Sequence, residues 1–271
     1  AAGNATTLTL ASPGATNSLG ANKAIIIDGN VPTVNSVTST KTDGSYKTIG
    51  EVIPITVTFS QLINVTGSPQ LTLETGESDA IVDYSSGTGT AVLTFNYTIA
   101  TGHTNYDLDY VSTSALALNS GTIKDASGNA ATLTLATPGE TNSLGANKAI
   151  IVDTVIPTFT FAPAGGSTAV SVSTNITITF NEAMRNTDDS ALSDTNIDGL
   201  ITLKNVDANG TDIAFDATIN DGKTEITINP TTDFTSEQVV YVAIGATLED
   251  GVDHAITAAS VTFTIADIIA P

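Results

Sequence analysis

The chain has 271 residues, enough for two domains that each bury a core of their own. It carries 28 acidic but only 8 basic side chains, a formal net charge of −20, which excludes nucleic-acid binding as its main function because that requires clustered Lys and Arg. The absence of cysteine excludes disulfides, and without an apolar run of about 18 residues the sequence predicts no membrane span.

Nearly the same segment occurs twice in the chain. Residues 3–28 align without gaps to residues 128–153, and four positions differ: Thr6/Ala131, Ser12/Thr137, Ala15/Glu140 and Ile27/Val152. Each copy ends in Asp-x-x-x-Pro, and a third instance of this motif follows at Asp267–Pro271. Proline ends strand pairing and stiffens a connection, so the motif indicates a joint between domains. The sequence therefore predicts the last strands of a preceding repeat with a linker (1–32), a complete repeat with a linker (33–157) and a second domain with an outgoing linker (158–271).

The first 28 residues are predicted to form a strand pair whose apolar side chains need a sheet to cover them. These side chains are Leu8, Leu10, Ile25 and Ile27. An isolated strand pair is barely stable in water. Two explanations remain open: the missing strands belong to a longer chain, as expected for a segment of a tandem array, or the pair is donated to a sandwich on another molecule.

Strand patterns follow along the rest of the chain. Apolar and polar residues alternate at 55–59, 71–73, 93–99, 133–135 and 176–180, and Gly- and Asn-containing turns separate these runs. Only residues 187–196 indicate a helical turn. The pattern predicts an all-β protein of tandem Ig-like β-sandwiches in an elongated array.

Two family resemblances agree with this prediction. The phrases VTFSQ, LTFNYTIATG and LGANKAIIVD resemble the Thr-rich Ig-like repeats of giant bacterial surface proteins. The phrases PAGGSTAVSVSTNITITFNEAM, DGKTEITINP and VTFTIAD resemble the bacterial Ig-like domain first named for a surface-layer protein. The resemblance implies an extracellular, surface-anchored or secreted protein. Relatives usually have Phe-Ser-Glu after the second strand, where the last domain has Glu182 and the middle domain has Gln61.

Acidic residues near the joints suggest calcium. In an Ig-like sandwich, the loops at the end of one domain should meet the linker and the loops at the start of the next. At the second joint we expect oxygen ligands from three places. The exit loop of the middle domain offers Asp107 and Asp109, and the linker offers Asp153. The last domain offers Glu182 and Asp250, with Asp253 as an alternative to Asp250. At the first joint we expect Asp28 and Asp125, with Gln61 nearby and hence weaker binding. Calcium takes roughly 6–8 oxygen ligands. The alternative is that these aspartates only cap turns.

Catalysis has little support in the sequence. The two histidines, His103 and His254, lie far apart in polar segments and are expected to face solvent. Without cysteine and with so few histidines, a zinc cluster is not expected. The sequence thus predicts a structural, non-enzymatic segment of a bacterial fibre, stalk or adhesin, whose partners are neighbouring Ig-like domains of the same or identical chains. A filament subunit that donates its first strands is one alternative. A module that binds a host glycan or protein is another, favoured if Tyr84, Tyr97, Tyr106 and Tyr110 share a concave surface.

Overall fold

A computed structural model describes residues 3 and 8–269 of the chain. It divides into two compact units, residues 1–152 (unit 1) and 153–271 (unit 2). The protein is nearly all β, with 40% of residues in strands and 4% in helices, as the alternation of the sequence predicts. Within the described residues, no helix is both long and apolar enough to cross a membrane.

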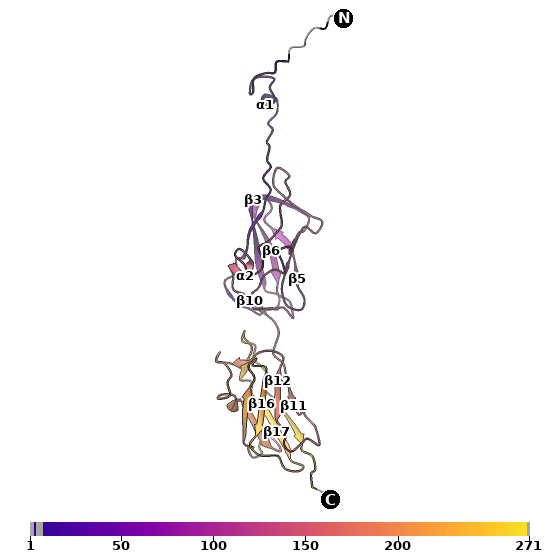
Figure 1. Cartoon of the computed structure of the whole chain (residues 1–271), viewed down its shortest axis with the longest axis vertical. Coiled ribbons are helices and arrows are strands. Elements are labelled where there is room, and N and C mark those ends of the chain that lie inside the picture. The colour runs from indigo at the N-terminus through magenta and orange to yellow at the C-terminus, as the bar shows by residue number, and fades with distance from the viewer. Residues whose placement is uncertain (1–2, 4–7, 270–271) are drawn as a thin grey trace. The chain divides into compact units, whose positions relative to one another are not determined.

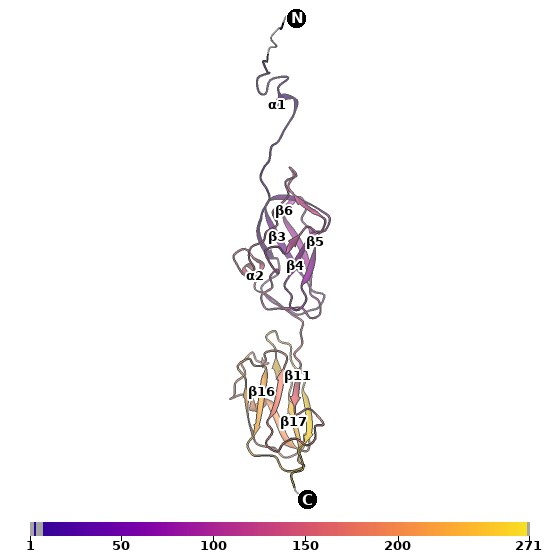
Figure 2. The same ribbon diagram turned by 45° about the vertical axis from the view of Figure 1, so that its right-hand side comes forward.

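Unit 1 is built around one long, bent strand. Its largest sheet has the order β1-β3-β6-β5-β4-β8, with β9 also on β3, and a smaller sheet has the order β2-β10-β7. Figures 1 and 2 show β3, β6 and β5 side by side. The strands are β1 (Val34–Ser39), β2 (Gly44–Tyr46), β3 (Val52–Thr66), β4 (Gln70–Leu73), β5 (Ala80–Ser86), β6 (Thr90–Thr98), β7 (Thr104–Asn105), β8 (Leu116–Ala117), β9 (Thr122–Lys124) and β10 (Ile150–Asp153).

The long strand β3 explains how this unit encloses a core. Ile53, Ile55 and Val57 are fully buried and alternate with half-exposed residues, so one face of β3 packs inward. The pairing of β3 with β6 shifts register between Thr58 and Ile63, after which β3 pairs with β9. Such an irregularity bends a strand, which lets β3 take part in both walls of the core.

Unit 2 has two principal sheets. One has the order β11-β12-β16-β15, the other β14-β17-β19, and β13 pairs with β18 apart from them. Ile176, Ile178, Ile226 and Ile228 project from β12 and β16 into the core. The strands are β11 (Phe159–Ala162), β12 (Ile176–Phe180), β13 (Arg185–Asn186), β14 (Ile201–Asn205), β15 (Phe215–Ile219), β16 (Glu225–Pro230), β17 (Val239–Ile244), β18 (Leu248–Glu249) and β19 (Ala259–Thr264).

The described helices are the single turns α1 (Leu19–Asn22), α2 (Leu144–Asn147) and η1 (Asp198–Leu200). A hydrogen-bonded turn at the end of 187–196 agrees with the helical turn predicted there, because the amides of Asn196 and Ile197 both donate to the carbonyl of Ser193 at 3.1 Å. The prediction of a strand at 133–135 was wrong. Residues 133–135 form no strand, although Leu135 is buried. The amide of Leu135 donates to the carbonyl of Thr113, which lies in an irregular segment and not in a strand. Apolar alternation alone therefore did not identify a strand.

The predicted strand pair at the start of the chain is also absent from the described residues. Residues 8–32 contain α1 but no strand, and residues 1–2 and 4–7 of the predicted pair lie outside the described part. Leu8 and Leu10 are each 89% exposed, Ile25 is 60% exposed and Ile27 93% exposed. Their counterparts in the second copy include Leu135, Ile150 and Val152, which are all buried in unit 1. The same sequence therefore forms a strand only where a sheet is available to pair with it.

Candidate metal centre

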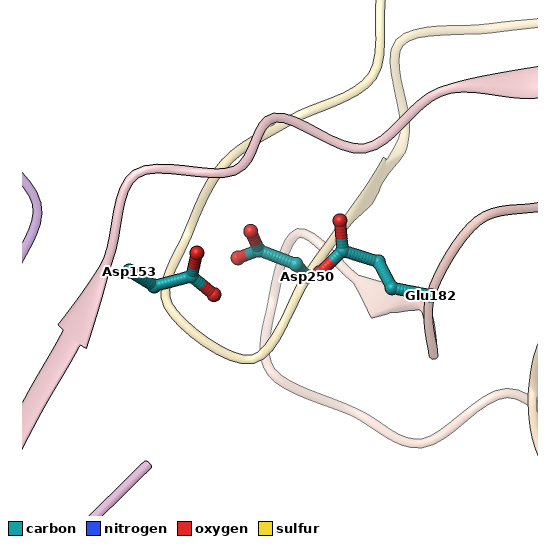
Figure 3. Close-up of side chains that lie close together, drawn as sticks. All are labelled: Asp153, Glu182 and Asp250. Carbon is teal, nitrogen blue, oxygen red and sulfur yellow. The ribbon is translucent and has the colours of Figure 1, made fainter. Parts of the chain in front are cut away.

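Three carboxylates of unit 2 converge from segments far apart in the sequence. Asp153 is the last residue of β10 and the first of unit 2, Glu182 lies two residues after β12, and Asp250 directly follows β18. One oxygen from each lies within 4.8 Å of the others. Figure 3 shows the three carboxylates directed toward a common space. Of the predicted ligands, the structure brings these three together.

Backbone hydrogen bonds hold two of these side chains in place. The Asp250 carboxylate accepts from the amides of Val252 (2.7 Å) and His254 (3.0 Å), which closes a five-residue turn. Its second oxygen lies 2.9 Å from Nδ1 of His254. The Asp153 carboxylate accepts from the amide of Val155 at 2.9 Å. These contacts fix the positions of both carboxylates within the cluster.

The cluster is electrostatically unfavourable without a cation. Asp153 and Asp250 are 1% and 0% exposed, whereas Glu182 is half-buried. Burial, followed by the negative charges of Asp250 and Asp153, raises the pKa of Glu182 above its ordinary value of 4.5. A divalent cation would remove this repulsion, and carboxylate oxygens are ligands suited to calcium.

A second acidic cluster in unit 2 already contains a positive charge. Asp189, Glu249 and Asp253 also lie within reach of one another. The guanidinium of Arg185 pairs with Asp189 at 2.8 Å, with Glu249 at 3.2 Å and also with Asp253. A fixed positive charge thus occupies this site, which makes Asp253 a poor alternative to Asp250 as a cation ligand.

Unit 1 contains a matching arrangement in which the amides of Gln61 and Asn129 stand where unit 2 has Glu182 and His254. Ninety-seven residues separate Asp28 from Asp125, as they separate Asp153 from Asp250. Asp125 accepts from the amides of Ser127 and Asn129, as Asp250 does from those of Val252 and His254. Its other oxygen accepts from Nδ2 of Asn129 at 2.8 Å and Nε2 of Gln61 at 3.2 Å.

The amides of unit 1 also bind the linker directly. Asn129 donates to the carbonyl oxygen of Asp28, and Gln61 donates to that of Asn30. The Asp28 carboxylate accepts from the hydroxyl of Ser127 and the amide of Asn30. Neutral donors thus join the linker, β3 and the turn in unit 1, and unit 2 has the carboxylate of Glu182 at the position of Gln61. Asn129 and His254 were not predicted as part of this arrangement, although both end a five-residue turn that begins with Asp.

The remaining predicted ligands, Asp107 and Asp109, belong to unit 1. Asp109 is buried, and its carboxylate accepts from the amides of Tyr110, Gly139 and Leu144 at 2.9, 3.0 and 3.2 Å. Asp107 is exposed, and burial together with the charge of Asp109 raises its pKa. Asp109 therefore organises the loop before β10, and participation of either residue in a metal site stays a prediction.

The prediction that both histidines face solvent was wrong. His103 stacks on Tyr97 with ring centroids 5.6 Å apart, and its Nδ1 lies 2.7 Å from the Tyr97 hydroxyl. The side chain of His254 is 17% exposed and contacts Asp250. Burial lowers the pKa of His103 below its ordinary value of 6.5. Polar sequence around a histidine did not indicate its exposure, because the partners come from elsewhere in the fold.

The Asp125 turn leads to a prediction for acid unfolding. Burial opposes the charge of Asp125, but hydrogen bonds from Asn129, Ser127 and Gly128 outweigh it and lower the pKa below 3.8. The unfolded chain then binds a proton more readily, so this carboxylate stabilises unit 1 above about pH 4 and the contribution is lost as the pH falls through the folded-state pKa. Acid unfolding followed by tyrosine fluorescence from about pH 5 to about pH 2 should be less pH-dependent in Asp125→Asn.

The control for this experiment is Asp79→Asn, which removes an exposed carboxylate of unit 1. It should leave the acid profile unchanged. Superimposable profiles for Asp125→Asn and the unaltered chain would contradict the assignment.

One comparison with known proteins concerns unit 2. A family model described as a bacterial Ig-like domain matches residues 153–265, nearly all of unit 2, and supports an Ig-like domain there. The match begins at the linker residue Asp153. No curated protein matches the chain significantly.

Several solved structures show weaker likeness. CopC from Methylosinus trichosporium OB3b is 11% identical with a TM-score of 0.29, covering 42% of this chain and 98% of that one. The titin A168169 structure is 8% identical with a TM-score of 0.36, covering 88% and 100%. The BSP domain of a biofilm-associated protein is 10% identical with a TM-score of 0.21, covering 86% and 52%. At these TM-scores the likenesses carry no functional argument.

Proposed function

We propose that the chain is a structural segment of an extracellular bacterial fibre, stalk or adhesin. The family match of residues 153–265 supports a bacterial Ig-like domain in unit 2. The repeated segment and linker support a tandem arrangement of such domains. The function is mechanical, supplying reach and stiffness for display at the cell surface, and no chemical step is assigned to it.

The proposal includes a calcium ion held by Asp153, Glu182 and Asp250. The observation that carries it is the convergence of three carboxylates, two of them almost fully buried, with the imidazole of His254 on one of them, Asp250. Asp153 is also the last residue of β10, whose other residues belong to unit 1. An ion that fixes this carboxylate against two loops of unit 2 would stiffen the joint, because it stabilises only conformations in which all three ligands meet.

The same proposal predicts weaker binding at Asp28 and Asp125. Amide groups of Gln61 and Asn129 already donate hydrogen bonds to Asp125 and to linker carbonyls. A cation would have to displace them. We therefore expect one strong calcium site in the chain.

Calorimetric titration of the chelator-stripped chain with calcium tests this proposal. One strong site is expected, and Glu182→Gln should weaken it by about tenfold or more because it removes a charged ligand. Glu225→Gln is the matched control, since this carboxylate lies on β16 outside the cluster and should leave affinity unchanged. No heat of binding up to about millimolar calcium, the weak limit for extracellular sites, would refute the calcium proposal but not the Ig-like assignment.

The exposed apolar side chains at the start of the chain favour a second candidate function. A filament subunit that donates residues of 1–28 to a neighbouring molecule would bury Leu8, Leu10, Ile25 and Ile27, which are exposed here. The third candidate, a glycan- or protein-binding surface of clustered tyrosines, has less support. Tyr97 and Tyr110 are buried in the core of unit 1, so they cannot contribute to such a surface.

A further inference from the structure

One edge of unit 1 is closed by residues 137–147, here called the plug. The amide of Val37 in β1 donates to the carbonyl of Asn142 at 2.9 Å, and Nδ2 of Asn147 donates to the carbonyl of Val37 at 2.8 Å. The plug contains α2, which packs on β1, and Leu144 in α2 is 0% exposed. The plug thus satisfies the backbone of an edge strand and adds a side chain to the core.

Unit 2 lacks a plug. The joint aspartates Asp28 and Asp153 are 125 residues apart, whereas Asp153 and Asp267 are 114 apart, a difference of 11 residues. Since the spacing from Asp153 to Asp250 matches that from Asp28 to Asp125, the whole difference falls after the turn, where unit 1 has its plug. The plug is itself 11 residues long.

The corresponding edge of unit 2 is open. Phe161 in β11 occupies the position that Val37 has in unit 1. Phe161 pairs with Ile178, two residues before Phe180, and Val37 pairs with Val57, two residues before Phe59. The amide of Asn181, just after β12, donates to the carbonyl of Thr158, and the amide of Thr158 donates to the side-chain oxygen of Asn181. Backbone groups along an edge strand point alternately toward and away from the neighbouring strand, so the N–H and C=O of Phe161, three residues further on, point away from β12. Among the described residues, no hydrogen bond closes this side of β11.

An apolar groove of about 660 Å³ lies along this edge, between β11 and β19. Its lining includes Ile156, Phe159, Phe161, Ala259 and Val261 and contains no charged side chain. In a chain with a net charge of −20, such a neutral groove stands out. An unpaired strand edge beside apolar side chains is suited to an added segment of backbone.

The chain carries a second copy of the plug sequence that is not seated. Residues 12–22 differ from the plug only at Ser12 and Ala15 and contain no charged residue. Their helix α1 has the same cap as α2, since the Ser18 side chain accepts from the amide of Ala21 as Ser143 does from Ala146. Leu19, the counterpart of buried Leu144, is 69% exposed. This segment has the local conformation of the plug but no groove to fill.

We propose that the groove between β11 and β19 receives residues 12–22 of a second copy of the chain. Leu19 enters the groove as Leu144 enters unit 1, and Asn17 and Asn22 bond the outward backbone groups of Phe161. The contact desolvates no charged side chain, because neither residues 12–22 nor the lining of the groove contains one. The contact is independent of the calcium proposal and deepens the filament candidate above, because it names which of residues 1–28 a second copy would receive and where.

Sedimentation velocity of the full chain, from about 1 µM to about 300 µM and with chelator present, tests the contact. Concentration-dependent association is expected, and Leu19→Asp and Ala259→Lys should each weaken it by about tenfold or more, as for a buried anchor. The matched controls are Ala21→Asp, whose counterpart Ala146 is exposed in unit 1, and Thr262→Lys, an exposed position on the opposite face of β19 from Ala259 that does not line the groove. Both controls should associate like the unaltered chain.

Cysteine pairing identifies the partners, because the chain has no cysteine of its own. Mixing Leu19→Cys with Ala259→Cys should give a disulfide-linked heterodimer, whereas Ala21→Cys with Thr262→Cys should not. A chain that stays monomeric throughout the concentration range, or association insensitive to Leu19→Asp, would overturn the proposal. A chain that carries both Leu19→Cys and Ala259→Cys and crosslinks only within single chains would also overturn the proposal, because the occupant would then not be a second copy.

Discussion

Replacement of Asp109 by alanine is expected to lower the free energy of unfolding of unit 1 by about 4 kcal/mol. The substitution leaves the amides of Tyr110, Gly139 and Leu144 without their acceptor in a buried loop. Each unsatisfied buried group costs about 1–3 kcal/mol, and water entering the space reduces the sum. The amides of Gly139 and Leu144 belong to the plug, so Asp109 links the loop after β7 to the segment that closes the edge of β1.

Urea unfolding followed by tyrosine fluorescence measures this loss. Five of the six tyrosines lie in unit 1, so the signal reports mainly on that unit. Asp107→Ala is the matched control, because it removes an exposed carboxylate two residues away and should change the free energy of unfolding by less than about 0.5 kcal/mol. A loss below about 1 kcal/mol in Asp109→Ala would show that the three hydrogen bonds are not essential to unit 1.

Calcium is expected to raise the thermal midpoint of unit 2 by about 10 °C. An ion in about 100-fold excess over its dissociation constant adds about 2.7 kcal/mol to the free energy of unfolding. For a unit of this size each kcal/mol shifts the midpoint by about 4 °C. Differential scanning calorimetry with and without chelator should show the shift in one of two transitions, that of unit 2.

The effect of pH on cation-free unit 2 has the opposite sign to that in unit 1. Folding raises the pKa of Glu182, so the folded state binds its proton more tightly than the unfolded chain does. Without calcium, stability therefore falls as the pH rises from about 4.5 through the folded-state pKa. Calcium offsets this loss by pairing with the ionised group.

Two variants in one turn separate the acidic clusters. Asp250→Asn should abolish the calcium-dependent rise of the midpoint, whereas Asp253→Asn should retain it, because Asp253 pairs with Arg185. An equal rise in Asp250→Asn and the unaltered chain would place calcium elsewhere. Loss of the rise in Asp253→Asn alone would favour the Arg185 cluster instead.

Local patterns predicted what depends on local chemistry. The alternation around Ile55 and Ile178 identified core strands, because burial of alternate residues is a property of the strand itself. The acidic residues of the linker, the strand end and the turn were predicted to lie together because both domains were expected to have the same strand order. The two units share that order near their joints.

What the sequence did not predict depends on contacts between distant segments. Leu133–Leu135 alternates like a strand, but its neighbours are loops, so no ladder forms. The conformation of residues 144–147 follows from a serine cap, whereas their position on β1 follows from Asp109 and Val37. The stacking of His103 on Tyr97 likewise requires the fold, since nothing in the local sequence reports it.

The exchange of two side-chain amides for a carboxylate and an imidazole gives the neighbouring modules different sensitivities to their surroundings. In unit 1 the turn is held by Gln61 and Asn129, which stay neutral whatever ions are present. In unit 2 the corresponding positions are Glu182 and His254. In calcium-poor water only the second module should soften, and proteases should cut there first. Two substitutions on a shared scaffold would thus be enough for evolution to set, module by module, where such a chain yields.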